Sequence, residues 1–171
     1  MKKQSIFNSV RGFTLIEILI VVAIIAILAS SVLVGFGPAQ RQGRDSRRIS
    51  DLRQVQNALE LYYAKCGYYP GPAQAGSGAC SGFSSINTWA ALEASIAGSN
   101  LGISATNIPN DPTSGKDYLY GTNAGGSSYT LGAYLEDTRN PALQSGPQAS
   151  SNGVPCTGAT NTTNPVYCIE F

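Results

Sequence analysis

One acidic residue stands inside the longest apolar stretch of the sequence. From Phe13 the chain reads FTLIEILIVVAIIAILASSVLVGF, and Glu17 is the one charged residue in that run. A carboxylate in such a stretch is costly to bury alone and therefore needs a partner. Cleavage between Gly12 and Phe13 would create a new amino group four residues before Glu17, about 6 Å away along a helix. The chemistry that these residues offer is ion pairing after a proteolytic cut.

The other polar residues do not form a recognisable catalytic motif. The 171-residue chain contains no histidine, and so lacks the commonest general base and a common zinc ligand. Its serines therefore have no histidine partner, and the sequence holds neither a phosphate-binding glycine loop nor carboxylates in a paired catalytic spacing. With 11 basic and 10 acidic residues, the chain is also too evenly charged for a polybasic nucleic-acid binder. We expect a protein that is not an enzyme.

The element that must position Glu17 is a long apolar helix. As a helix, the 24 residues from Phe13 to Phe36 would extend about 36 Å, more than the ~30 Å thickness of a hydrocarbon layer. Three basic residues and no acid precede the run, which predicts a cytoplasmic N-terminus and an outer location for the rest of the chain. The run is too long for an ordinary secretory signal, and no A-x-A cleavage site follows it.

The residues from Arg11 to Glu17, RGFTLIE, resemble the cleavage and methylation motif of type IV pilins and type II secretion pseudopilins. The likeness continues without a gap to Ala29. It implies that a membrane aspartyl prepilin peptidase cuts between Gly12 and Phe13, that the new N-terminus is methylated, and that mature chains polymerise. Glu17 of one subunit would then pair with the terminal amine of Phe13 in a neighbour, which offsets the cost of burying either charge alone.

The sequence divides into four parts. We expect a cleaved basic leader over residues 1–12, a transmembrane and polymerisation helix over 13–37, the amphipathic half of the same helix over 38–65, and a globular head over 66–171. Glycine and proline residues near the end of the apolar run predict a bend or local melting between the two helical halves, namely Gly35, Gly37 and Pro38.

The amphipathic half carries apolar residues three or four positions apart, which places them on one face of a helix. They are Ile49, Leu52, Val55, Leu59 and Tyr62. The helix should end before Gly67 and Pro70. Together, the two halves predict one long spine helix.

Five arginines cluster at the start of the amphipathic half, together with Asp45 and Asp51. They are Arg41, Arg44, Arg47, Arg48 and Arg53. A DNA-binding stripe is one interpretation. We favour the other interpretation, a solvated helix face with local ion pairs such as Asp45 with Arg48 and Arg48 with Asp51. DNA binding is disfavoured because neighbouring subunits in a filament would cover this region. No nucleic-acid partner is therefore expected.

The head has the pattern of a mixed α+β domain. A short helix is expected over residues 88–97, capped by Asn87 and stopped by Gly98, with Trp89, Leu92 and Ile96 on one face. Strands are expected over residues 116–120, 128–135 and 166–171. This order is similar to the pilin fold, in which a long N-terminal spine helix packs on a small antiparallel sheet with disulfide-closed loops.

The four cysteines all follow the apolar run, as expected for a head outside the reducing cytosol. They are Cys66, Cys80, Cys156 and Cys168. Four cysteines allow three full pairings. We favour the sequential pairing, because each bridge would close a loop with little regular structure, and a loop of about 15 residues gains ~3 kcal/mol in the chain-entropy model. A zinc site is disfavoured because no C-x-x-C pair or histidine is present.

Acidic residues of the head could supply oxygen ligands to calcium. The resemblance implies this possibility, because the major pseudopilins that the chain resembles use calcium in their sheet loops. The candidates are Asp111, Asp117, Glu136 and Asp137. We favour ordinary loop acids and assign no metal and no cofactor.

Two functions follow from the resemblance. The chain is expected to be a structural pilin of a type IV pilus, because a disulfide between Cys156 and Cys168 near the C-terminus resembles pilins. The alternative is a major-type pseudopilin of a type II secretion system, favoured by Asn110-Asp111-Pro112 and the tyrosine-rich strands. Expected partners are copies of itself or other pilins, the prepilin peptidase, an assembly platform protein, an ATPase and the membrane. The subunit would first be a single-pass inner-membrane protein and then part of a cell-surface filament.

Overall fold

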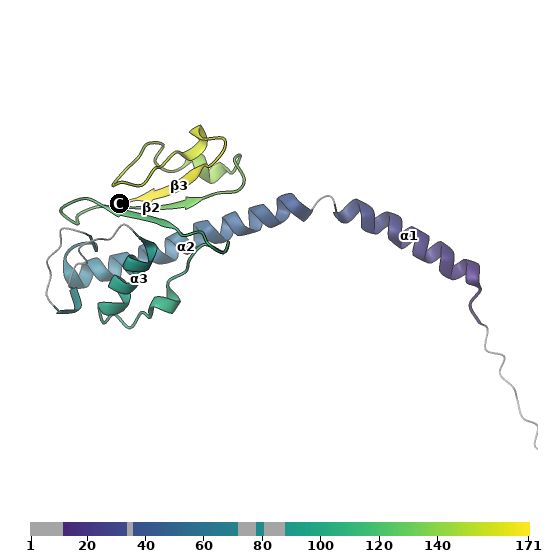
Figure 1. Ribbon diagram of the computed structural model, residues 1–171, viewed down its shortest axis with the longest axis horizontal. Coiled ribbons are helices and arrows are strands. Elements are labelled where there is room, and N and C mark those ends of the chain that lie inside the picture. Colours follow the sequence, from purple (N-terminus) through teal and green to yellow (C-terminus); the bar gives the residue numbers. More distant parts are fainter. Residues whose placement is uncertain (1–11, 34–35, 72–77, 81–87) are drawn as a thin grey trace, which may run out of the picture. The chain divides into compact units, whose positions relative to one another are not determined.

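A computed structural model of the chain describes residues 12–33, 36–71, 78–80 and 88–171. The chain forms two compact units, Met1–Ala39 and Gln40–Phe171. Apart from Gly12, the expected leader lies outside the described residues. Figure 1 labels α1, α2, α3, β2 and β3. The described residues also form four short 3-10 helices, at Gly78–Cys80, Ala105–Asn107, Pro141–Gln144 and Gly158–Thr160.

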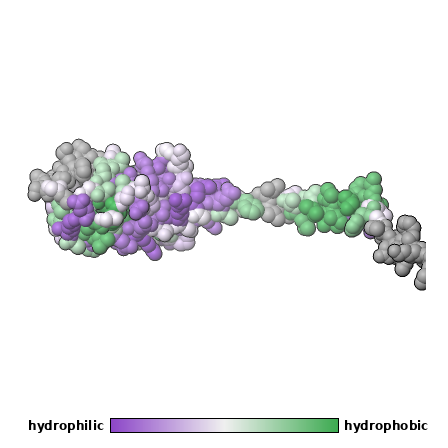
Figure 2. Space-filling model, turned by 90° about the horizontal axis from the view of Figure 1, so that it is seen from below, coloured by the Kyte–Doolittle hydropathy of each residue, from purple (hydrophilic) through white to green (hydrophobic). Residues whose placement is uncertain are grey.

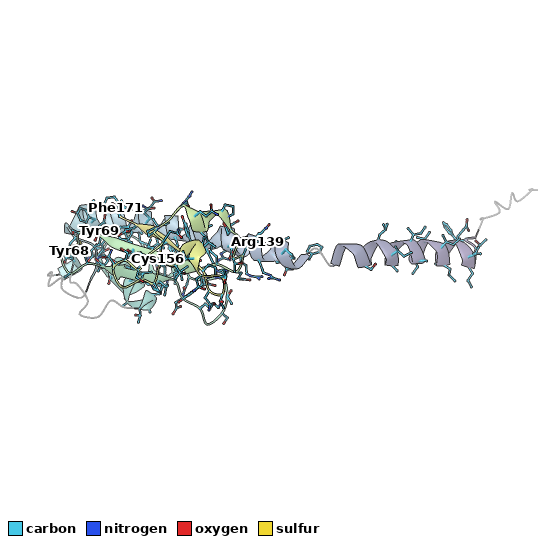
Figure 3. The ribbon with its side chains drawn as sticks, turned by 90° about the horizontal axis from the view of Figure 1, so that it is seen from above. Tyr68, Tyr69, Arg139, Cys156 and Phe171 are labelled. Carbon is cyan, nitrogen blue, oxygen red and sulfur yellow. A yellow bond between two sulfur atoms is a disulfide. The ribbon has the colours of Figure 1, made fainter. Side chains whose placement is uncertain are left out.

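The first unit contains α1, Leu15–Leu33, whose described side chains from Leu15 to Ser30 are all exposed. Figure 2 shows this helix as a continuous hydrophobic surface, and in Figure 3 its side chains project on all sides. Across the part of the chain that the structure describes, no helix combines the length and hydropathy needed for a membrane crossing. The span expected over residues 13–37 includes residues 34 and 35, which lie outside the described part.

The second helix, α2, runs from Phe36 to Cys66, and Pro38 does not interrupt it. Pro38 lies in the first turn, where the backbone N–H that proline lacks would have no intrahelical acceptor. The helix ends where Gly67 adopts a positive φ of 78° and donates its N–H to the carbonyl of Tyr63 at 2.7 Å. The spine that we predicted as one helix is therefore described as two, α1 and α2.

One face of α2 forms the core of the head, as its periodicity predicts. Leu52, Val55, Leu59 and Tyr62 are buried, and Ile49 packs at the edge of the same cluster. The short helix α3, Trp89–Gly98, contributes Trp89, Leu92 and Ile96 to that cluster, also as predicted. These contacts hold α2 and α3 against one face of the sheet.

The ends of α3 differ from the prediction. Thr88 is the N-cap, and its side chain accepts from the N–H of Ala91 at 3.3 Å, whereas Asn87 lies outside the described residues. Gly98 belongs to the helix, and Ser99 is the C-cap. A threonine at this position has the same capping chemistry as the asparagine that we expected to cap the helix.

The sheet is antiparallel with the order β1-β2-β3, so the predicted α+β fold with a long helix on a small sheet is confirmed. Its strands are β1 Leu119–Thr122, β2 Tyr129–Tyr134 and β3 Val166–Glu170. The first strand begins three residues later than predicted. The reason is a turn, because the N–H of Lys116 donates to the carbonyl of Thr113, and Gly115 has a φ of 78°.

The C-terminal segment covers the outer face of the sheet. Val154, Cys156, Val166 and Cys168 form a second buried cluster on that face. Gly121 permits this packing, since a Cβ there would collide with the backbone carbonyl of Asn152.

The cysteines form the sequential pairs, Cys66 with Cys80 and Cys156 with Cys168. The Cα atoms are 5.6 and 5.8 Å apart in the two bridges. The second bridge lies inside the outer cluster and ties the C-terminal segment to β3. At one end of the head, the rings of Tyr69 and Phe171 lie together, with centroids 5.9 Å apart (Figure 3).

Candidate assembly site and the ion-pair cluster of the head

Glu17 closes a capping box at the start of α1. The N–H and the hydroxyl of Thr14 both donate to Oε2 of Glu17, at 2.9 and 2.7 Å. The backbone N–H of Glu17 donates in return to the hydroxyl of Thr14, at 3.3 Å. Each residue thus satisfies a backbone donor that the first helical turn leaves without a partner. The acid that stands in the apolar run therefore has a partner within its own chain.

This role of Thr14 was not predicted, although the sequence carries its signal. A threonine followed three positions later by a glutamate, before an apolar run, is the pattern of a capping box. The structure also places Phe13 before the first residue of α1, Leu15, so the helical distance of about 6 Å from Phe13 to Glu17 does not apply to this unassembled chain.

Both residues of the expected cleavage site are exposed. The side chain of Phe13 is 84% exposed, and nothing lies within 4 Å of a Cβ placed on Gly12. Packing within the described chain therefore does not require glycine at residue 12. An open, non-helical backbone at residues 12–14 is a shape that a protease can bind.

A second cluster of charges lies in the head around Arg48, whose side chain is fully buried. Its Nη1 donates to Asp45 at 2.7 Å and to Glu136 at 2.9 Å. Its Nε and Nη2 donate to the two oxygens of Asp111, at 2.8 and 3.0 Å, and Nη2 also donates to Thr113 at 2.8 Å. Breaking one partner of such a buried pair typically costs about 3–5 kcal/mol.

Two further contacts extend the cluster. Arg44 donates from two nitrogens to the carboxylate of Glu136. The carboxylate of Asp45 accepts the backbone N–H groups of Glu136 and Asp137, at 2.8 to 3.1 Å. The cluster therefore fastens the segment after β2 to α2 through both side chains and backbone.

The hydrogen bonds of the cluster shift its pKa values. The hydrogen bond from Arg44, together with those from Arg48, lowers the pKa of Glu136 to about 2 despite the opposing effect of burial. Burial would raise the pKa of Asp111, but the bonds from Arg48 and Thr113 outweigh it and lower that pKa. Burial likewise opposes the charge of Arg48, yet its carboxylate partners raise its pKa.

The prediction of a solvated arginine face is wrong for Arg48. The local pair with Asp45 forms as predicted, but Arg48 does not pair with Asp51. Instead, Asp51 accepts from the hydroxyl of Tyr118 at 2.8 Å and lies 3.6 Å from Arg47. Carboxylates distant in sequence surround Arg48 and take the place of solvent.

The acids considered as calcium ligands are already engaged. Asp111 and Glu136 bind Arg48, and Asp117 accepts from Asn110 at 2.7 Å. Asp137 accepts the N–H of Arg139. Within residues 12–33, 36–71, 78–80 and 88–171, no group of three or more acidic, cysteine or histidine side chains is arranged to hold a metal ion.

Comparison with known proteins identifies the N-terminal segment. The family described as the prokaryotic N-terminal methylation motif matches residues 7–33. Type II secretion system core protein G of Escherichia coli K12 is 37% identical over 60 residues, and that of Vibrio cholerae O1 is 33% identical over 70 residues. The corresponding protein of Pectobacterium carotovorum is 33% identical over 64 residues.

These similarities cover 35%, 41% and 37% of this chain, respectively. The chain spans about two-fifths of the length of these relatives, at 41%, 44% and 41%. No solved structure matches the chain.

The methylation motif, the long helix on a small antiparallel sheet and these relatives show that the chain is similar to type IV pilins and type II secretion pseudopilins. The three relatives are each named as core protein G of a type II secretion system. Their names favour the pseudopilin alternative over the pilin that we expected from the terminal disulfide.

Proposed function

We propose that this chain is a major-type pseudopilin of a type II secretion system, a structural subunit that polymerises through α1. The names of the relatives support this function. The single structural observation that carries it is the exposed apolar helix α1, which begins at a capping box formed by Thr14 and Glu17. An apolar surface exposed on all sides needs a membrane or other helices to cover it.

Assembly begins with processing. The prepilin peptidase removes residues 1–12 by cutting between Gly12 and Phe13, and Phe13 is methylated at its new N-terminus. Before assembly the subunit is held in the inner membrane by residues 13–37, with its head outside. An assembly platform protein and an ATPase then move it into a filament of like subunits.

Glu17 has a second partner in the filament. Its carboxylate leaves Thr14, at least in part, to pair with the terminal amine of Phe13 in a neighbouring subunit. Burial of the apolar α1 surfaces drives association at about 25 cal/mol per Å². The charge pair selects one axial register, because a displaced helix would bury the carboxylate without a cation.

Substitution of Glu17 tests this function. We expect Glu17→Val to leave cleavage at Gly12 intact and to abolish filaments, as judged by immunoblot of the processed chain and electron microscopy of sheared fibres. Glu17→Gln is the matched control, because a glutamine retains the capping acceptor but not the charge. Abundant filaments from Glu17→Gln would contradict charge pairing.

A type IV pilin is the second candidate, because the Cys156–Cys168 bridge closes a loop near the C-terminus. Deletion of the chain separates the two functions. A pseudopilin deletion stops export of secreted enzymes to the medium, whereas a pilin deletion removes long surface filaments and leaves export unchanged.

A further inference from the structure

A groove opens on the surface of the head between α2 and the loop that follows α3. It encloses about 260 Å³, less than the ~300–1,000 Å³ of a typical small-molecule site, so its size suits one or two side chains of a partner. Its lining is mainly apolar, and the apolar lining residues are Val55, Ala58, Leu61, Ile103, Ile108 and Pro109.

Leu61 is the most exposed apolar residue of this groove. It is 54% exposed, although Leu59 and Tyr62 on the same helix are fully buried. Leu61 lies about 200° around α2 from Leu59, so it points away from the core. Among the described residues of the head, the large hydrophobic side chains that remain exposed are those of Leu61, Tyr63 and Phe171. Packing within the head therefore leaves the groove open.

Phe171 and Tyr63 form a second exposed apolar surface, which we call the aromatic patch. Phe171 is 60% exposed, and its ring packs on the buried ring of Tyr69 with centroids 5.9 Å apart (Figure 3). The ring of Tyr63 packs on Tyr69 as well, at 4.7 Å. The hydroxyls of Tyr69 and Tyr129 both donate to the carboxylate of Glu60, at 3.1 and 3.2 Å, which fixes these two rings beneath Phe171. A side chain on such a rigid base loses little conformational entropy when it binds.

The two surfaces are flanked by opposite charges. The acids at the start of α2, Asp45 and Asp51, are buried, so the exposed charges of that stretch are arginines. These exposed arginines, the last of which directly precedes the groove, are Arg41, Arg47 and Arg53. In the aromatic patch, the exposed Glu170 precedes Phe171, and the half-buried Glu60 lies beneath the rings. Complementary charges of this kind orient two surfaces as they approach.

Two different apolar surfaces on one subunit suit a polymer. When a projection on one subunit enters a groove elsewhere on the next, the contact is heterologous, and it repeats along a helical filament if the rotation closes no ring. We propose that Phe171 of each subunit inserts beside Leu61 into the groove of a neighbouring copy and so sets the rotation of the heads in the filament. The proposal rests on the proposed function in one respect, namely that the chain polymerises, and a pilin would satisfy this as well.

Cysteine cross-linking of full-length chains in filaments tests this contact. All four native cysteines are already paired, so introduced thiols react with one another. We expect the double variant Leu61→Cys, Phe171→Cys to give a ladder of dimers, trimers and longer chains on mild oxidation, because a disulfide forms only where Cβ atoms lie within about 4.5 Å. Each single variant should stay monomeric, since like positions do not meet in a heterologous contact.

Gln42 supplies a matched control for the position of the thiol. It is exposed on α2 but lies 19 residues before Leu61, about 28 Å along the helix. We expect Gln42→Cys combined with Phe171→Cys to give no ladder.

Truncation of the two side chains measures their share in assembly. Phe171→Ala and Leu61→Ala should each reduce the yield of filaments several-fold, and the double variant should reduce it no further, because both changes remove one contact. Both side chains are more than half exposed, so the melting temperature of the head, followed by Trp89 fluorescence, should change little.

Three results would overturn this contact and leave the proposed function intact. The first is a Leu61→Cys, Phe171→Cys variant that forms filaments but gives no ladder. The second is a dimer from either single variant, which would indicate an isologous contact. The third is an equal ladder from the Gln42→Cys control pair. If the unsubstituted chain forms no filaments, the proposed polymerisation fails and this contact fails with it.

Discussion

Thr14 is the observed hydrogen-bond partner of Glu17. Its hydroxyl and N–H both hold the carboxylate of Glu17, the group that we propose to pair with a neighbouring subunit. In the proposed function, assembly would therefore exchange an internal partner of Glu17 for an external one. The net gain of the proposed ion pair would then be smaller than the interaction of two free charges, because Glu17 would have to give up capping contacts to form it.

Substitution of Thr14 tests the capping box. Thr14→Val keeps the shape of the side chain but removes the hydroxyl that accepts from Glu17 and donates to it. We expect hydrogen exchange of the amides in the first turn of α1 to become several-fold faster in detergent micelles. Thr14→Ser, which retains the hydroxyl, should exchange like the unsubstituted chain. Equal exchange in Thr14→Val and the unsubstituted chain would exclude the capping role.

At the scale of elements, the two faces of the sheet are covered by different parts of the chain. The inner face packs on α2 and α3 through aromatic and aliphatic side chains. The outer face is covered by an irregular segment that the Cys156–Cys168 bridge ties to β3. Because this segment has little regular structure, its position depends on the bridge, on backbone contact with Gly121 of β1 and on the contact of the Val154 side chain with Gly132 of β2.

Gly121 of β1 provides a test of that close contact. A Cβ at this position would collide with the backbone carbonyl of Asn152, so one of the two backbone segments would have to shift. We expect Gly121→Ala to destabilise the head by about 1–3 kcal/mol, as overpacking in a core does, measured by Trp89 fluorescence in denaturant. Gly125→Ala is the matched control, because its nearest atom is the Ser127 hydroxyl at 4.0 Å. Equal midpoints for the two variants would contradict the predicted collision.

At the scale of the whole molecule, the ion pairs of the head predict its response to acid. The pKa of Glu136 falls from 4.5 to about 2 on folding, and the pKa of Asp111 is also lowered. A carboxyl group with a lowered pKa stabilises the folded state above its ordinary pKa, and this contribution is lost as the pH falls toward the folded value. Burial and the charge of Asp117 raise the pKa of Glu93, so protonation of Glu93 favours folding and offsets part of the loss.

We therefore expect the melting temperature of the head to be constant near neutral pH and to fall between about pH 4.5 and pH 2. The fluorescence of Trp89, the single tryptophan, which is buried in the core, measures this melting temperature. Glu136→Gln should lower the melting temperature near neutral pH and flatten the fall in acid, because the variant has one carboxylate fewer to protonate. If the melting temperatures of the variant and the unsubstituted chain fell in parallel with pH, Glu136 would not be the cause of the acid destabilisation.

The sequence by itself determined the features that depend on neighbours along the chain. The motif from Arg11 to Glu17, the buried face of α2 and the fold class all follow from spacings of a few residues, which secondary structure converts directly into position. The capping box of Thr14 and Glu17 also follows from such a spacing, although it was not predicted. The local pair of Asp45 with Arg48 was also predictable, because i,i+3 residues are neighbours on a helix.

Only the tertiary structure decided where the charges of the head lie. Arg48 looks like a solvated residue in the sequence, since its further partners Asp111 and Glu136 are 63 and 88 positions away. The fold brings these three segments together because the hydrophobic cluster packs both loops against α2. Burial then strengthens the pairing of charges that water would screen, so Arg48 becomes the centre of the ion-pair cluster of the head.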